Sequence, residues 1–321
     1  MKRAILQLLL FASAVAAQAQ EIANPVWRNS WPDPTIWQAE DGNYYSLCTG
    51  LKRTLVSKDL FHWEVIERSV VSKEAWSKMR EYGQYFWAPD IVTINGQRLM
   101  YITLYNSAKD SSIAVLKEVS PNKFEFHDIV TRSIETGIID TIDAEVVKDK
   151  KSGKVWLFFG SIGKIHRVEL TRDGLGIKKG AKYTHAAGLS KKESRSRAKV
   201  FEGCYLHRHN GYWYMFVSAG WYNDHTYKLL VGRSRKLTGI FRDREGRPMT
   251  EGYATPVIVS EKGDFFYGPG HCGEIFTKDN REYIFYHCHN KGTEHRFRPL
   301  MLQEIKWDSY GWPYVEGGKP R

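Results

Sequence analysis

Five stretches of the chain share one pattern of polar and hydrophobic positions. Each begins with an ionisable residue, continues through a short apolar run, turns at a cluster of Gly, Asn or Asp, and returns through a run dense in aromatic residues. Short runs of this kind, separated by turn residues, are typical of antiparallel β-hairpins. The five stretches are "DPTIWQAEDGNYYSLCTG" from Asp33, "DIVTINGQRLMYITLYN" from Asp90, "DAEVVKDKKSGKVWLFFGS" from Asp143, "FEGCYLHRHNGYWYMFVSAG" with Glu202, and "HCGEIFTKDNREYIFYHCH" from His271.

Further short apolar runs follow several of these hairpins, such as "SSIAVLKEV" near residue 111 and "YKLLVGRS" near residue 227, and little helical periodicity is present. A unit of several antiparallel strands that recurs every roughly 50 to 70 residues is typical of the blades of a propeller. The sequence therefore predicts an all-β fold: a five-bladed β-propeller with a central channel and an active site at one mouth.

The residues that begin equivalent inner strands of a propeller must converge near its axis. We therefore expect Asp33, Asp90, Asp143, Glu202 and His271 to form a ring at one end of the channel. A single Asp in such a place is more often a turn cap, and a single His is more often a hydrogen-bonded core residue. Four carboxylates and an imidazole gathered together are costly to bury, however, so their recurrence indicates a functional site.

Length and composition allow one large domain. The chain has 321 residues, of which 42% are hydrophobic and 14% aromatic, which is enough for an extensive core. Its start, "MKRAILQLLLFASAVAAQAQ", combines basic residues, an apolar run and an Ala-Gln-Ala ending, which is typical of a secretory signal peptide. The predicted organisation is a signal peptide at 1–19 and a single propeller domain at 20–321. The protein is expected to be exported, to the periplasm or the medium, without membrane insertion.

Charge and cysteine content exclude little but set expectations about partners. The formal net charge of +11 is spread along the chain, with one dense basic run, "SKKESRSRAK", at 190–199. A solvated loop explains that run better than a nucleic-acid partner, because no recognised binding module accompanies it. The four cysteines show no metal-ligand spacing and are expected to be buried as small apolar residues rather than paired. Nothing in the sequence requires oligomerisation, so a monomer is predicted.

The segments "WPDPTIW", "FWAPDIV", "TIDAEVV", "FEGCYLHRHNGYWYMFVSAG" and "GPGHCGEIF", in this order, resemble glycoside hydrolase family 43. This is the arabinanase, arabinofuranosidase and β-xylosidase group of five-bladed propellers. The resemblance implies an inverting glycoside hydrolase that acts on an arabinose-containing polysaccharide or oligosaccharide. It places the general base at Asp33, the general acid at Glu202, and at Asp143 a carboxylate that orients the acid and raises its pKa. A xylose- or galactan-active enzyme, and a glycan-binding propeller without catalysis, are the alternatives.

Residues around the carboxylates are candidates for sugar binding, because flat aromatic rings cover the apolar face of a sugar. Besides Asp90 and His271, the aromatic candidates are Trp31, Phe86, Trp87, Trp221 and Phe266. No cofactor is required by this chemistry. The resemblance also implies a possible structural calcium in the central channel, which would reach His271 through water molecules because calcium prefers six to eight oxygen ligands.

Overall fold

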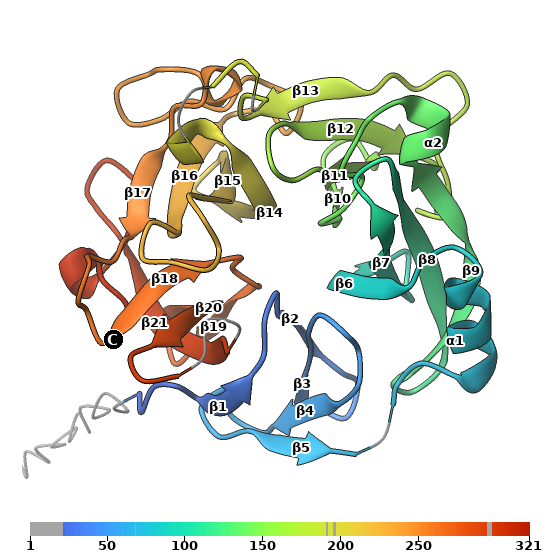
Figure 1. Cartoon of the computed structure of the whole chain (residues 1–321), viewed down its shortest axis with the longest axis horizontal. Coiled ribbons are helices and arrows are strands. Elements are labelled where there is room, and N and C mark those ends of the chain that lie inside the picture. Colours follow the sequence, from blue (N-terminus) through green and yellow to red (C-terminus); the bar gives the residue numbers. More distant parts are fainter. Residues whose placement is uncertain (1–21, 68, 191, 195–196, 294–296) are drawn as a thin grey trace, which may run out of the picture.

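Five antiparallel sheets follow one another along the chain and surround a common axis (Figure 1). The computed structural model describes residues 22–67, 69–190, 192–194, 197–293 and 297–321. The predicted all-β, five-bladed propeller is confirmed. The predicted signal peptide at 1–19 lies outside the described residues. None of the helices in the described part of the chain is long and apolar enough to cross a membrane.

In blades 1 to 4, the strands follow one another outward from the axis in sequence order. Blade 1 comprises β2 (Thr35–Gln38), β3 (Tyr44–Leu47), β4 (Thr54–Ser57) and β5 (Glu64–Ile66). Blade 2 comprises β6 (Tyr85–Ile94), β7 (Gln97–Ser107), β8 (Asp110–Ser120) and β9 (Lys123–Arg132). Blade 3 comprises β10 (Glu145–Lys148), β11 (Val155–Phe159), β12 (Ile165–Leu170) and β13 (Thr184–Ala187). Blade 4 comprises β14 (Phe201–His209), β15 (Tyr212–Ala219), β16 (Lys228–Ser234) and β17 (Thr255–Ile258).

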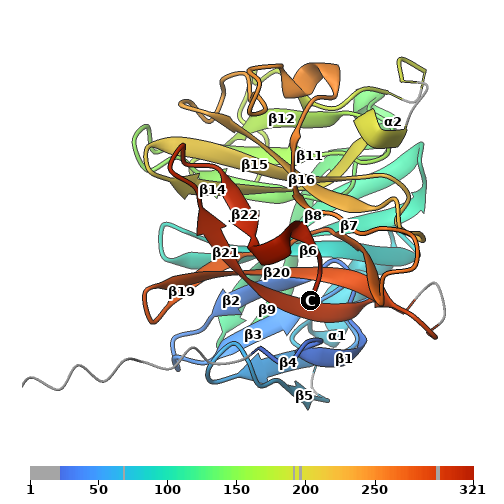
Figure 2. The ribbon, with the colours of Figure 1, turned by 90° about the vertical axis from the view of Figure 1, so that its left-hand side faces the viewer.

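Blade 5 is assembled from both ends of the chain. It contains β18 (Phe266–Gly270), β19 (Ile275–Lys278), β20 (Arg281–Asn290), β21 (Pro299–Trp307) and β22 (Pro313–Val315), together with β1 (Trp27–Ser30). The helices are short: α1 (Lys73–Arg80), α2 (Ser133–Thr136), and the 3-10 turns η1 (Arg197–Lys199), η2 (Met249–Glu251) and η3 (Glu316–Gly318). Both β1 and β22 pair with β21, which closes the ring beside the C-terminus (Figures 1 and 2).

The hairpins form where the sequence places Asn-Gly pairs. Asn95 and Gly96 connect β6 to β7 with φ of 52° and 84°, and Asn210 and Gly211 connect β14 to β15 with φ of 44° and 81°. Two consecutive left-handed residues define the type I′ turn, whose twist matches that of paired strands. The turn clusters recognised in the sequence therefore set the register of these inner hairpins.

The hydrophobic core lies between neighbouring blades. Five separate clusters of buried side chains each join one blade to the next, as where Met100 and Ile102 of blade 2 meet Leu47 and Leu51 of blade 1. The four cysteines are all buried with free thiols, so the predicted role as apolar filling is confirmed. Each fully buried Leu, Ile or Phe contributes roughly 1.5 to 3 kcal/mol relative to exposure, so the interfaces between blades dominate stability.

Two rings of hydrogen bonds also tie each blade to the next around the axis. In the upper ring, the backbone N–H of a left-handed residue, which lies shortly before an inner strand or within its first four residues, donates to a side chain of the preceding blade. The donor and acceptor pairs are Asp33 and His287, Ala88 and Thr49, Asp143 and Thr103, Gly203 and Asp143, and His271 and Ser218.

The lower ring lies a short step further along the same strands. There a side chain of one inner strand accepts from a backbone N–H of the next blade. The acceptor and donor pairs are Thr35 and Ile91, Asp90 and Val146, Glu145 and Leu206, Tyr205 and Ile275, and Glu274 and Ile36. The two rings of hydrogen bonds fix the positions, along the propeller axis, at which side chains from different blades meet.

Candidate active site

The left-handed residues of the upper ring place side chains from several blades at one mouth. Asp33, Asp143 and His271 have φ of 55°, 57° and 44°. A left-handed residue kinks the strand start, which turns the side chain away from the alternation of the strand. Gly203 holds the same place in blade 4, and a Cβ there would lie 2.8 Å from the His271 ring. A side chain at this position would therefore displace His271, while Glu202 next to it reaches into the site.

These side chains line a cavity of about 570 Å³. Asp33, Asp143, Glu202, Trp87, Trp221 and His271 of the predicted site all contribute to its wall. The structure therefore brings three carboxyl groups that are remote in sequence to one hollow. The other lining residues include Thr49, Tyr85, Tyr105, Asp140, Ser161, Tyr222, Tyr227 and Arg298.

Asp90 does not join them, which corrects the predicted ring. The residue of blade 2 that is equivalent to Asp33 is Ala88, with φ of 43°. Asp90 belongs to the lower ring, where its Oδ2 accepts from Val146 N at 2.8 Å. Burial raises the pKa of Asp90 to about 7. Its carboxyl lines a second cavity, beside Glu145.

Asp33 is surrounded by positively charged and donor groups. Its Oδ1 lies 3.3 Å from Arg298 Nη1, 3.3 Å from His271 Nδ1 and 3.5 Å from His287 Nδ1. Thr49 Oγ1 donates to its Oδ2 at 2.6 Å. Burial alone would raise the pKa of Asp33, but Arg298, followed by His271 and the Thr49 hydroxyl, holds it well below its usual value. Asp33 is therefore ionised across the neutral and mildly acidic range.

Glu202 and Asp143 have a different environment. Tyr227 Oη donates to Glu202 Oε1 at 2.7 Å, and Ser161 Oγ donates to Oε2 at 2.8 Å. Burial, followed by the negative charges of Glu202 and Asp33, raises the pKa of Asp143 well above its usual value. Asp143 therefore retains its proton at higher pH than a solvated carboxyl group would.

A chain of contacts connects the two sides of the cavity. The ring of Tyr227, whose hydroxyl bonds Glu202, stacks on the ring of His287 at 6.0 Å and 9° between planes. His287 Nδ1 in turn accepts from the backbone N–H of Asp33 at 3.0 Å. Burial, followed by the charge of Arg298, lowers the pKa of His287 well below its usual value, which keeps this nitrogen free to accept.

Aromatic rings form part of the wall. Trp87 stacks on Tyr105 at 4.1 Å and lies 6.0 Å from Tyr85, so three rings of blade 2 stand together. Trp221 is 36% exposed, which leaves part of its ring accessible from the cavity. Such flat apolar faces beside carboxylates can cover the C–H face of a sugar ring.

Three predicted sugar-binding aromatics lie elsewhere. Phe86 alternates with Trp87 along β6 and so points the opposite way, into the core between blades 1 and 2. Trp31 is buried between blades 5 and 1, where its Nε1 donates to Ser46 Oγ at 2.8 Å. Phe266 packs against the core between blades 4 and 5. The structure thus gives these three side chains a packing role.

Sequence reasoning missed the residues that tune the carboxyl groups. Arg298, Tyr227, Ser161 and Thr49 stand outside the hairpin starts that carry the repeat. Thr49 and Ser161 each follow the second strand of their blade directly or closely, so the ends of the returning strands were the available signal. The calcium ion near His271 stays a prediction: Asp33 Oδ1 lies 3.3 Å from His271 Nδ1, and this carboxylate is one oxygen donor of the several that calcium needs.

The known proteins that this chain resembles are glycoside hydrolases, which agrees with the carboxyl groups found in the cavity. The sequence model of the family described as Glycosyl hydrolases family 43 matches residues 22–313. The extracellular endo-α-(1→5)-L-arabinanase 1 of Bacillus subtilis is 30% identical over 95% of this chain and 93% of its own. The extracellular exo-α-(1→5)-L-arabinofuranosidase ArbA of Cellvibrio japonicus is 27% identical over 88% of this chain and 86% of its own.

Solved structures that are similar in fold include arabinanases as well. The Cellvibrio cellulosa α-L-arabinanase complexed with arabinohexaose has a TM-score of 0.77 at 26% identity, over 90% of this chain and 96% of its own. An exo-1,5-α-L-arabinanase from a bovine ruminal metagenomic library has a TM-score of 0.74 at 28% identity, over 90% of this chain and 97% of its own.

Proposed function

The chain belongs to glycosyl hydrolase family 43 and is a glycoside hydrolase, and from this premise we propose that it cleaves α-1,5-linked L-arabinan with inversion of configuration. The observation that carries the proposal is the division of the cavity into a side at Asp33, which is ionised, and a side where Asp143 retains its proton beside Glu202. The relatives named above, which act on or bind arabinose polymers, support the choice of substrate.

The two sides perform complementary proton transfers. Asp33, ionised, accepts a proton from a water molecule whose oxygen attacks the anomeric carbon. Glu202 gives its proton to the glycosidic oxygen as the bond to the anomeric carbon breaks. Asp143 shares the proton of the pair and, through the Gly203 amide, is tied to the strand that carries Glu202. Water attack on the face opposite to the leaving group inverts the anomeric carbon.

Positioning follows from the groups around the carboxylates. Tyr227 and Ser161 hold both oxygens of Glu202, so the acid keeps one orientation. Trp87 and Trp221 offer their rings to the sugar units beside the cleaved bond. Orientation of the acid, base and substrate makes the reaction effectively intramolecular, which lowers the entropic part of its barrier.

Hydrolysis of linear α-1,5-arabinan tests the proposal. We expect release of reducing ends, with the first product detected by proton NMR in the inverted anomeric form. Glu202→Gln and Asp33→Asn should each lose nearly all turnover. Asp33→Asn removes one partner of the buried pair with Arg298, so its thermal midpoint should fall, and circular dichroism at the assay temperature shows whether each variant is folded. Wild-type activity on xylan or galactan without activity on arabinan would contradict the substrate, and retained configuration would contradict the mechanism. Sizing the products separates internal cleavage from release at chain ends.

Export, association state and the calcium ion are part of the same proposal. The relatives named as extracellular and the composition of residues 1–19 support secretion with removal of that segment. Mass spectrometry of the exported protein should then give a chain that begins near residue 20. Light scattering should give a monomer. Elemental analysis after dialysis against calcium should give one tightly held ion, whose water ligands would meet the His271 ring and fix its orientation.

A further inference from the structure

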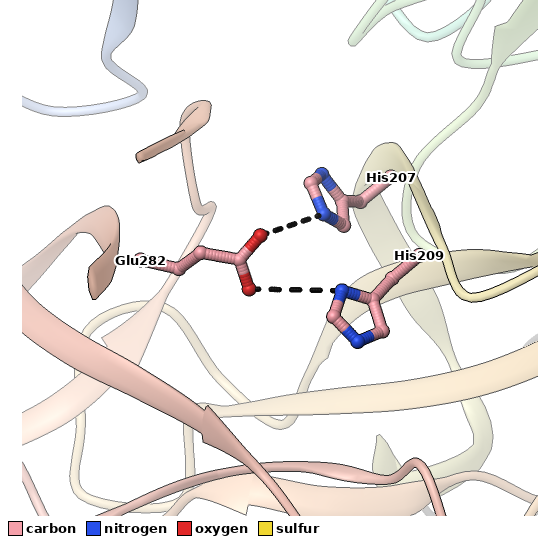
Figure 3. A group of neighbouring side chains, drawn as sticks. All are labelled: His207, His209 and Glu282. Carbon is pink, nitrogen blue, oxygen red and sulfur yellow. Dashed lines mark ion pairs between the residues drawn. The ribbon is translucent and has the colours of Figure 1, made fainter. Parts of the chain in front are cut away.

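A second group of chemically active side chains lies away from the cavity, between blades 4 and 5. His207 and His209 sit two positions apart on β14 and therefore share one face of the strand. Both imidazoles point toward Glu282 of β20, as Figure 3 shows. His207 Nε2 lies 3.9 Å from Glu282 Oε1, and His209 Nδ1 lies 3.7 Å from Oε2.

We propose that His207, His209 and Glu282 bind a zinc-type divalent transition-metal ion. Their ligand atoms all lie within 4.8 Å of one another, and this is the one group of three or more potential metal ligands that meets this criterion in the described part of the chain. Two imidazoles and a carboxylate form a ligand set that zinc binds with a water in the fourth position. In a tetrahedral zinc site, ligand atoms stand roughly 3.3 Å apart, so small side-chain rotations close this triangle.

The imidazole and carboxylate ligand atoms of the group are not hydrogen-bonded to one another. Both imidazole–carboxylate separations exceed hydrogen-bond length. The Nε2 atom of His207 is buried and has no hydrogen-bond partner. A buried ring nitrogen left in this state costs free energy, and a metal ion is one partner that removes the cost. The three side chains are 16 to 21% exposed, which gives an ion a path from solvent.

Trp307 of β21 holds two of the three ligands. Its ring stacks on His209 at 3.7 Å with 7° between planes, and its Nε1 donates to Glu282 Oε2. On the other side, Tyr205 Oη lies 3.5 Å from His207 Nδ1, the ring nitrogen that faces away from Glu282. Partners of this kind, which orient a metal ligand through its second polar atom, are a regular feature of built metal sites.

The site would join two strands that also serve the cavity. β14 begins beside Glu202 and reaches His207 about 15 Å further along, at the usual rise per residue of a strand. β20 carries Glu282 at one end and His287, the partner of the Asp33 amide, toward the other. A bound ion would therefore clamp blades 4 and 5 together away from the catalytic groups, which assigns it a structural role.

The proposal is tested on the mature protein stripped with a chelator and titrated with Zn²⁺ by calorimetry, with calcium in excess throughout so that a calcium site elsewhere stays saturated. We expect one Zn²⁺ per wild-type chain and a rise in thermal midpoint on saturation. His207→Ala and Glu282→Gln should weaken binding at least tenfold and abolish the rise. Trp307→Phe keeps a stacking ring but loses the N–H donor, so it should weaken binding about 10- to 100-fold.

A matched control removes a histidine elsewhere. His127 is exposed on β9, and His127→Ala should bind Zn²⁺ as wild type does. Circular dichroism of each metal-free variant shows whether it is folded, and Co²⁺ absorbance of wild type should show four-coordinate geometry that Glu282→Gln lacks. The proposal is overturned if wild type binds no Zn²⁺ in this assay, or if folded Glu282→Gln binds it as tightly as His127→Ala does. Arabinan hydrolysis is a separate readout, so failure of this site leaves the proposed activity untouched.

Discussion

Arg298→Gln should shift the acid limb of the pH–rate profile, because Arg298 is the largest of the charges that keep Asp33 ionised. Arg298 Nη1 lies 3.3 Å from Asp33 Oδ1, and both side chains are 14% exposed. At that distance, with an effective dielectric constant near 20, Coulomb's law gives about 5 kcal/mol as an upper bound. Measured effects of an adjacent Arg on an Asp pKa run from about 1 to 3 units. His271 and the Thr49 hydroxyl remain in the variant, so we expect a rise of the Asp33 pKa within that range.

The assay is kcat/KM on linear arabinan measured from about pH 3 to pH 8, since its acid limb reports the base of the free enzyme. In wild type the limb should lie at or below the acid end of this range, and in the variant it should move toward neutral pH by 1 to 3 units, whatever happens to its maximum. Exposed Arg235 provides the control, and Arg235→Gln should leave the limb in place. A lower maximum with an unmoved limb would refute the reasoning, because Arg298 would then bind substrate without tuning Asp33.

Stability supplies an independent check on the same pair. A carboxyl whose pKa is lowered on folding stabilises the protein above its unfolded value of 3.8, and this contribution is lost as the pH falls toward the folded value. Removing one partner of a buried ion pair costs about 3 kcal/mol or more. The thermal midpoint of Arg298→Gln should therefore lie below that of wild type at neutral pH. The gap should narrow as the pH falls below about 4.

Three other substitutions probe the proton pair and the rings of hydrogen bonds. Asp143→Asn should lose activity. It should also raise the thermal midpoint at neutral and alkaline pH, because a carboxyl whose pKa is raised on folding destabilises the folded state wherever the unfolded chain ionises it. This gain in thermal midpoint should vanish near pH 4. Tyr227→Phe removes a donor to Glu202, so kcat should fall about tenfold or more with KM little changed. Glu145→Leu leaves the buried N–H of Leu206 without its acceptor, so it should lower the free energy of unfolding in urea by about 1 to 3 kcal/mol. Stability equal to that of wild type would argue against a role for the lower ring.

The fold could be read from the sequence because each blade repeats its own local signals. Asn-Gly pairs at 95–96 and 210–211 mark hairpins, and aromatic runs mark the returning strands that pack between blades. The carboxyl groups of blades 1, 3 and 4 could be grouped for the same reason, since each begins a repeat. What the sequence did not show was the exact register of each repeat at its start.

Blade 2 illustrates why register was the weak point. Asp90 is the first charged residue of its repeat, so alignment by charge matched it to Asp33, whereas alignment by backbone matches Ala88. A left-handed φ at a non-glycine residue leaves little trace in composition. The tuning residues were hidden for another reason: Arg298 comes from the chain beside β21 and meets Asp33 only because blades 5 and 1 are neighbours in the closed ring.

The five left-handed positions of the upper ring are structurally equivalent, and the backbone does not depend on which side chain stands there. Three of these positions carry ionisable side chains: Asp33, Asp143 and His271. Gly203 has no side chain, and the adjacent Glu202 reaches the site instead, while Ala88 carries only a methyl group. The backbone N–H of each of these residues donates a hydrogen bond to a side chain of the blade before it, so the side chain at the position can differ while this contact is kept. Each blade thus contributes its own side chain to the site, and a substitution at one of these positions would change the chemistry of the site while the backbone hydrogen bond of that position stays the same.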